Sequence, residues 1–116
     1  MQDYFINRLA HERREHFIIL CLDNQNRLFS EETISVGTVT QTAVYTREVA
    51  GTALKHQAQA VFLLHNHPSG ELTPSRADID VTRDIEKALA AMGVALHDHL
   101  IIADTTCVSF KIFGHL

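Results

Sequence analysis

Residues 60–67, with the sequence AVFLLHNH, constrain the fold more than any other part of the chain. The run is apolar without alternation until it reaches two histidines, a pattern typical of a central strand covered on both faces. A turn-rich segment from His67 to Ser75 follows. Beyond it, a helix ending at Gly93 is predicted by the regular spacing of Ile79, Thr82, Ile85, Leu89 and Met92.

The remaining elements are expected on both sides of this unit. Asp23 to Asn26 predict a turn that joins two strands into an antiparallel hairpin, and Thr46 is a candidate N-cap. We expect helices at 3–13 and 46–58, and strands at 16–22, 27–36, 94–103 and 108–113. This order predicts an α/β fold with a mixed sheet and helices on both faces. The length of 116 residues predicts a single domain, 1–116.

Composition excludes several classes of protein. With 10 basic and 14 acidic residues, the net charge is −4, which argues against direct binding to nucleic acid. No apolar run is long enough for a membrane span, and the charged N-terminus does not resemble a signal peptide, so we expect a cytoplasmic protein. Cys21 and Cys107 are isolated in apolar strand patterns and are expected to be buried thiols.

Three side chains between His65 and Asp78 point to a metal ion. Because alternate residues of a strand share a face, His65 and His67 point the same way and Asn66 the opposite way. The helix that starts near Ser75 returns Asp78 in its first turn. Two imidazoles and one carboxylate leave a fourth tetrahedral position for water, as in catalytic zinc sites. We therefore expect one Zn²⁺ per chain.

Hydrolysis would also require a base and a hydrogen-bond donor. A carboxylate must take the proton of the attacking water, and the candidates are Glu12, Glu15, Glu31, Glu32 and Glu48. We rank Glu15 first, because the strand that follows it could pair beside residues 60–67, then Glu32 and Glu48. Ser75 is placed to donate a hydrogen bond to the developing oxyanion.

The spacing His65-x-His67, seven residues, Ser75, two residues and Asp78 resembles the JAMM signature of JAB/MPN metalloproteases. The string HNHPSG, with REHF before it and DHLII after it, resembles the RadC-like branch of that family, roughly from Arg14 onward. The resemblance implies zinc on His65, His67 and Asp78, a glutamate acid/base matching Glu15, and Ser75 as the transition-state donor. It also implies a three-layer α/β sandwich with a mixed sheet, similar to that of cytidine deaminases.

Simpler interpretations compete with these assignments. Ser75-x-x-Asp78 is also the sequence of a helix capping box, which needs no metal. The second pair, His97-Asp98-His99, has no matching third ligand and is expected to be structural, although Asp98 and His99 could support the zinc ligands. A core role, rather than base stacking, is expected for Phe17, Phe29, Phe62, Phe110 and Phe113.

Two other metal chemistries fit less well. A non-haem iron oxygenase also uses two histidines and a carboxylate, but its usual long barrel strands are not indicated in this sequence. A zinc deaminase requires the motifs H-x-E and P-C-x-x-C, and the sequence contains neither.

Together these patterns predict a zinc-dependent peptidase or isopeptidase that hydrolyses an amide bond in a protein or peptide substrate. The alternative is a non-catalytic metal-binding module associated with DNA repair.

Overall fold

A computed structural model describes residues 2–36 and 42–116 of the chain. The described residues form one mixed sheet of five strands in the order β2-β1-β3-β4-β5. The strands are β1 (His16–Leu22), β2 (Leu28–Val36), β3 (Ala60–Asn66), β4 (Ala95–Ala103) and β5 (Thr106–Ser109), and the helices are α1 (Gln2–Leu9), α2 (Thr42–Lys55) and α3 (Arg76–Ala91). No described helix has the length and apolar character required to cross a membrane.

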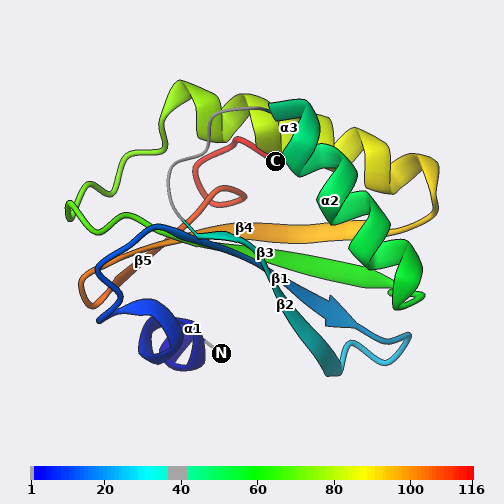
Figure 1. The fold of residues 1–116 in the computed structure, drawn as a ribbon, viewed down its shortest axis with the longest axis horizontal. Helices are drawn as coiled ribbons and strands as arrows, with labels where there is room; N and C mark the ends of the chain where they lie inside the picture. Colours follow the sequence, from blue (N-terminus) through cyan, green and yellow to red (C-terminus); the bar gives the residue numbers. More distant parts are fainter. Residues whose placement is uncertain (1, 37–41) are drawn as a thin grey trace.

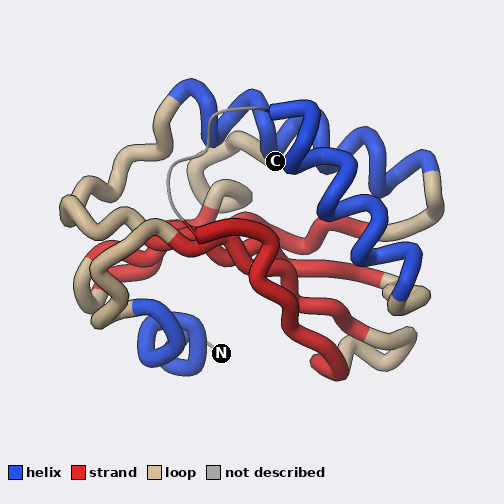
Figure 2. The backbone as a smooth tube through the Cα atoms, viewed as in Figure 1, coloured by secondary structure: helices blue, strands red, loops and turns tan. Residues whose placement is uncertain are grey.

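Strand β3 lies at the centre of the sheet. It pairs antiparallel with β1 and parallel with β4, and α3 forms the crossover between the two parallel strands. Helices α2 and α3 cover one face of the sheet and α1 covers the other (Figure 1), so the strands form the middle of three layers (Figure 2). The predicted three-layer α/β architecture with a mixed sheet is confirmed.

Burial on both faces explains the uninterrupted apolar character of β3. Val61 and Leu63 pack on the face covered by α2 and α3, whereas Leu64 packs on the face covered by α1. The neighbouring strand β1 divides its side chains in the same way, with Ile19 on the first face and Ile18 on the second. A polar residue within these strands therefore lies in an apolar environment, unless it sits at a strand end.

Helix α3 has the two ends that the sequence predicts. Ser75 is its N-cap, in a capping box closed by Asp78. At the other end Gly93 has a φ of +75°, and it donates to the carbonyl of Ala90 while Val94 donates to that of Leu89. This pair of bonds is a Schellman motif, in which glycine avoids the strain of a left-handed conformation.

The predicted boundaries of three elements were wrong. The first helix ends at Leu9 rather than at residue 13, because the charged residues that follow offer no apolar face. The second begins at Thr42 rather than after Thr46, since its buried stripe of Tyr45, Val49 and Ala53 starts earlier than we expected. The last strand spans 106–109 instead of 108–113, because the Ser109 hydroxyl accepts the N–H of Ile112 and caps a turn there.

The expectation that five phenylalanines belong to the core was partly wrong. Phe17 and Phe110 are fully buried, and Phe62 packs against the α1-side cluster. Phe29 and Phe113, by contrast, are 47% and 64% exposed. Phe29 lies near the start of edge strand β2 and Phe113 in the turn after β5, where no layer covers them. Cys21 is buried as expected, whereas Cys107 is only partly buried.

The buried stripe of α3 provides a test of this packing. Ile85 is fully buried between α3 and the sheet, so Ile85→Ala should lower the free energy of unfolding by about 2–5 kcal/mol. Leu54 on α2 is 66% exposed, so Leu54→Ala should change it by less than about 0.5 kcal/mol. Urea unfolding followed by circular dichroism measures both variants. Equal losses would contradict the assigned layers.

Candidate metal centre

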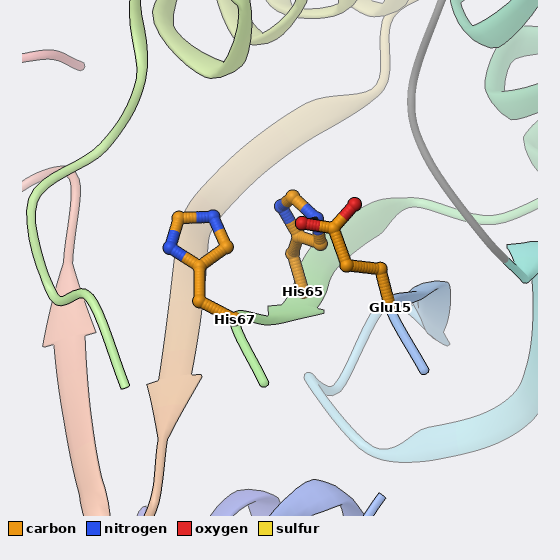
Figure 3. Close-up of side chains that lie close together, drawn as sticks. All are labelled: Glu15, His65 and His67. Atoms are coloured by element: carbon orange, nitrogen blue, oxygen red, sulfur yellow. Dashed lines mark ion pairs between the residues drawn. The ribbon is translucent and has the colours of Figure 1, made fainter. Parts of the chain in front are cut away.

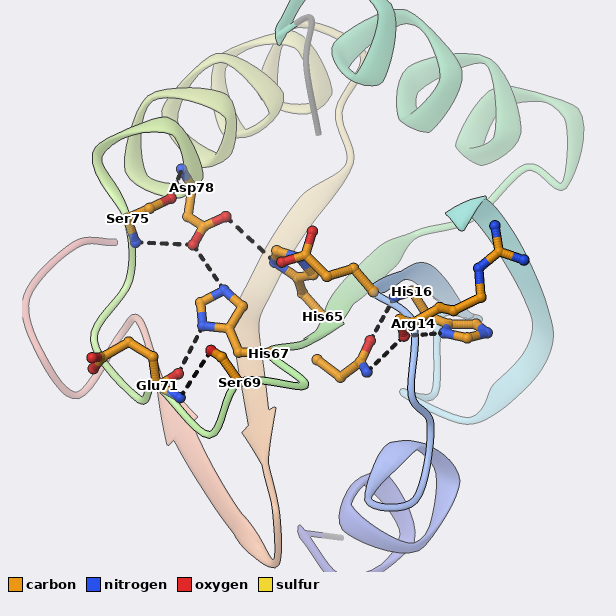
Figure 4. Close-up of polar contacts among 10 residues, drawn as sticks. Arg14, His16, His65, His67, Ser69, Glu71, Ser75 and Asp78 are labelled. Carbon is orange, nitrogen blue, oxygen red and sulfur yellow. Dashed lines mark hydrogen bonds and ion pairs between the residues drawn. The ribbon is translucent and has the colours of Figure 1, made fainter. Parts of the chain in front are cut away.

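Four titratable side chains from three segments meet at one end of the sheet. His65 and His67 lie at the carboxyl end of β3, and Asp78 is in the first turn of α3 (Figure 4). Glu15 immediately precedes β1 (Figure 3). The antiparallel register places Phe17 opposite His65, and two residues earlier the same register brings Glu15 toward His67. The loop from His67 to Ser75 reverses the chain and returns Asp78 to the histidines.

The ligand atoms of Glu15, His65 and His67 all lie within 4.8 Å of one another (Figure 3). Among the described residues, this is the group of three or more histidine, cysteine or acidic side chains close enough to hold a metal ion. Asp78 lies against the same histidines: its Oδ1 is 3.4 Å from His65 Nδ1 and its Oδ2 is 3.1 Å from His67 Nε2. The structure thus brings together all four residues that the sequence analysis singled out for a metal and a base.

His67 presents one nitrogen to the protein and the other to the site. Its Nδ1 lies 2.8 Å from the carbonyl of Glu71, and because a carbonyl only accepts, Nδ1 must carry a proton. In a neutral ring Nε2 would then direct a lone pair at the Asp78 carboxylate. The hydrogen bond that His67 Nε2–H donates to Asp78 raises the pKa of His67, because a proton on Nε2 removes this repulsion. A metal cation in the place of that proton would do the same.

His65 lacks the hydrogen bonds that a buried imidazole normally makes. The residue is 2% exposed, and neither ring nitrogen hydrogen-bonds to any described residue. Nδ1 faces Asp78, while Nε2 is 3.9 Å from Glu15 Oε1. Burial lowers the pKa of His65 to about 4, so the ring is neutral near pH 7 and its lone pair is available for a ligand. Buried polar atoms without partners commonly mark a functional site or an ion.

Asp78 closes the helix cap and faces both histidines at once. Its backbone N–H donates to Ser75 Oγ, and its Oδ2 accepts the N–H of Ser75. Burial opposes ionisation of this carboxyl group, but the hydrogen bond from His67 and the proximity of His65 lower its pKa overall. The capping box and the contact with the histidines are therefore compatible, although the sequence analysis treated the first as a rival of metal binding.

The residues present fit a zinc ion. Zinc prefers nitrogen and oxygen ligands at about 2.0–2.2 Å in a tetrahedral arrangement, which places neighbouring ligand atoms about 3.3–3.6 Å apart. The two contacts of Asp78 with the histidines, at 3.1 and 3.4 Å, end on different carboxylate oxygens, and the group whose ligand atoms all lie within 4.8 Å of one another contains Glu15 in place of Asp78. A shared cation would bind the lone pair of His67 Nε2 and one of the two unpartnered ring nitrogens of His65.

Glu15 borders an open cavity of about 270 Å³ that is also lined by Ser69, Glu71, Thr73 and Ser75. Its side chain is 30% exposed, so water reaches it. Partial burial raises the pKa of Glu15; nearby His67 opposes this rise, and the charge of Asp78 adds to it. The higher pKa makes the carboxylate a stronger base. The pKa of Glu32, which pairs with His56 and Lys55, is lowered instead.

The other glutamates considered as bases lie outside this cavity. Glu31 pairs with Arg8, and Glu32 pairs with His56 and Lys55. Glu32 also lines, together with Glu48, a separate cavity between β2 and α2. Glu12 approaches His16 at 3.8 Å. Glu15 is therefore the one of the five candidates that lies in the group with both histidines.

A third buried histidine, His99, supports Asp78 through Thr82. The Thr82 hydroxyl donates to the backbone carbonyl of Asp78, so it must accept its 2.6 Å hydrogen bond from Nδ1 of His99. Burial lowers the pKa of His99 to about 3, which keeps the ring neutral. His99 was among the expected outer partners of the metal site. Thr82 was not, because the sequence indicated only that it lies on the buried face of the helix. His97 hydrogen-bonds to Asn26 instead.

Comparison with known proteins gives one family. The chain matches the RadC-like JAB domain family over residues 1–114. It is also 46% identical over 114 residues to a UPF0758 protein from Ruegeria pomeroyi, an alignment that covers 98% of this chain and 51% of the relative. The chain therefore spans about half the length of the curated relative it matches.

The buried histidines predict a loss of stability in mild acid when metal is removed. Above the unfolded-state pKa of about 6.5 they are neutral in both states, and as the pH falls only the unfolded chain takes up protons. Between pH 7 and 5, His65 and His99 should each reduce the free energy of unfolding by about 2 kcal/mol. The raised pKa of His67 offsets part of this loss, because it favours the folded state below about pH 6.5.

Urea unfolding of chelator-treated protein at several pH values measures this dependence. The His99→Gln variant should be less stable at pH 7, because the ring that stacks on Phe110 is lost, yet it should lose less stability on acidification. An unchanged slope in this variant would show that His99 does not carry the effect.

Proposed function

Because the chain belongs to the RadC-like JAB domain family, we propose that it is a zinc-dependent hydrolase that cleaves amide or isopeptide bonds in a protein or peptide. One observation carries this proposal. The Asp78 carboxylate faces two imidazoles, one of them buried without hydrogen bonds, beside a glutamate that borders an open cavity. This combination of donors fits a metal ion together with a base.

His65, His67 and Asp78 would hold one zinc ion per chain. When bound, zinc lowers the pKa of water toward about 7 and polarises a carbonyl group. The hydrogen bond from His67 Nδ1 to Glu71 orients one ligand, and the capping box orients Asp78. Such supporting contacts fix the direction of a ligand's lone pair and increase its basicity.

Glu15 acts as general base and then as general acid in this proposal. Its Oε1 lies 3.9 Å from His65 Nε2, so its carboxylate is beside the ligands without a direct hydrogen bond to them. The carboxylate takes a proton from the attacking water and returns it to the leaving amine. Its raised pKa, caused first by burial, suits both transfers.

Ser75 supplies the remaining hydrogen bond. Its Oγ accepts the N–H of Asp78, so the hydroxyl proton is free to be donated into the cavity that Ser75 lines. Ser75 is also the N-cap of α3, and the positive end of the helix dipole favours a developing oxyanion nearby.

Replacing single residues should separate metal binding from catalysis. His67→Ala and Asp78→Ala should lose stoichiometric zinc, because each removes a ligand. Glu15→Gln should keep zinc and lower kcat by about 10²–10⁴-fold, because it removes the base. Zinc content by mass spectrometry and turnover of fluorogenic peptide and isopeptide libraries, with and without chelator, measure these effects.

Glu32→Gln is the matched control, because this glutamate was ranked second as the base and lies in the other cavity. It should retain both zinc and activity. Loss of zinc in Glu15→Gln would instead make Glu15 a ligand. Stoichiometric zinc without turnover across the libraries would favour a non-catalytic metal-binding module.

Two variants at Ser75 distinguish its role as a hydrogen-bond donor to the oxyanion from its role as the N-cap of α3. Ser75→Ala should lower kcat by about 10²–10³-fold and reduce stability by about 1 kcal/mol. Ser75→Thr keeps a hydroxyl that serves both roles and should remain within about tenfold of the wild-type kcat. Steady-state kinetics and urea unfolding of the zinc-loaded protein measure the pair. A Ser75→Ala enzyme with unchanged kcat would limit Ser75 to capping.

A further inference from the structure

We propose that Asn66, the residue between the two histidines, is a positioning residue that holds Glu15 in the site by binding the backbone on both sides of it. This inference rests on the proposed role of Glu15 as the base. It gives a role to Asn66, whose side chain points away from the face of the sheet that carries His65 and His67.

The backbone around Glu15 has little support from regular structure. Helix α1 ends at Leu9 and strand β1 begins at His16, so Glu15 belongs to an irregular connection. Glu15 is nevertheless the side chain whose position the chemistry depends on most. A displacement of about 1 Å in a reacting group can reduce the rate by about 10²-fold. Some contact outside the β-ladders must therefore fix this segment.

The side-chain amide of Asn66 makes that contact. Its Oδ1 accepts the backbone N–H of His16 at 2.5 Å, and its Nδ2 donates to the backbone carbonyl of Arg14 at 2.9 Å. The dashed lines that reach Arg14 and His16 in Figure 4 include a further bond, in which His16 Nδ1 lies 2.8 Å from the same Arg14 carbonyl. Because a backbone N–H only donates and a carbonyl only accepts, the partners determine the orientation of the amide. The two bonds bracket Glu15.

Other side chains could not make both bonds from this position. A carboxylate lacks the donor for the Arg14 carbonyl, and a serine hydroxyl is too short to span the two partners. Glutamine has the same amide group on a longer stem. Asn66 is 2% exposed, whereas Arg14 is exposed and His16 half-buried. A polar side chain at position 66 that lost one of the two partners would therefore keep an unsatisfied polar group in a buried position.

The alternation of β3 couples this contact to the metal ligands. His65 and His67 project to the α3 side of the sheet, and Asn66 projects to the opposite side, where it meets the segment before β1. The same three residues thus present two ligands and fix the base. Any movement of the strand end carries the imidazoles and the Glu15 backbone together, which keeps their relative geometry constant.

The test compares Asn66→Ala and Asn66→Asp with Leu64→Val. Asn66→Ala should retain stoichiometric zinc, because it leaves His65, His67 and Asp78 unchanged, while kcat falls about 10–100-fold and KM changes less than about threefold. Asn66→Asp keeps the acceptor for His16 but not the donor for Arg14, and it should also lose at least tenfold in kcat. Leu64 lies on the same strand and face but outside this contact, so Leu64→Val should retain kcat.

Amide hydrogen exchange gives a readout that is independent of activity. The His16 amide should be protected in the wild type and in Asn66→Asp, and it should exchange at least tenfold faster in Asn66→Ala. Thermal unfolding checks that all the variants fold. An unprotected His16 amide in the wild type, or an Asn66→Ala protein with wild-type kcat and bound zinc, would overturn the positioning role.

The Glu15→Gln variant separates failure of this inference from failure of the proposed function. If Glu15→Gln is inactive and Asn66→Ala is fully active, the positioning role alone is wrong. If Glu15→Gln is fully active, or the wild type shows no zinc-dependent turnover, the proposed function is wrong and the role of Asn66 in it fails too.

Discussion

The placement of one carboxylate between two imidazoles is the constraint on which the rest of this site depends. Asp78 accepts the N–H of Ser75, lies 3.1 Å from His67 and 3.4 Å from His65, and is almost fully buried. A buried carboxylate is unfavourable unless hydrogen bonds or positive charge compensate it. The hydrogen bond from the Ser75 N–H and the raised pKa of His67 provide this compensation, and a bound cation would add to it. Strand β3 is central in the sheet and covered on both faces, and this position shields the histidines from water.

Much of this arrangement is local in sequence, and for that reason it could be predicted. The continuous apolar character of β3, the turn after His67 and the capping box of α3 are short-range patterns. These patterns predicted strand β3, helix α3 ending at Gly93, and the proximity of His65, His67 and Asp78. The errors occurred where weak local signals depended on distant neighbours. The early start of α2 depends on the burial of Tyr45 against the sheet, and the exposure of Phe29 and Phe113 depends on which layers reach them.

The remaining parts of the site come from long-range pairing. From the residues alone, Glu15 could be ranked first only by supposing that β1 lies beside β3, whereas the family resemblance implied Glu15 directly. The contact of Asn66 with Arg14 and His16 joins residues about fifty positions apart, and the support of Asp78 through Thr82 and His99 crosses from α3 to β4. None of these contacts leaves a periodic or motif-level signal. They become visible only when the strand order and the side-chain directions are known.

The different sequence separations within the site have a consequence for how it assembles as the chain folds. His67 and Asp78 are eleven residues apart, so closing the loop between them costs little conformational entropy, whereas bringing the segment before β1 to Asn66 closes a loop of about fifty residues. Contacts of short separation form faster than contacts of long separation. The strand–turn–helix part of the site is therefore expected to form early, so that the histidines and Asp78 meet before the segment that carries Glu15 joins them.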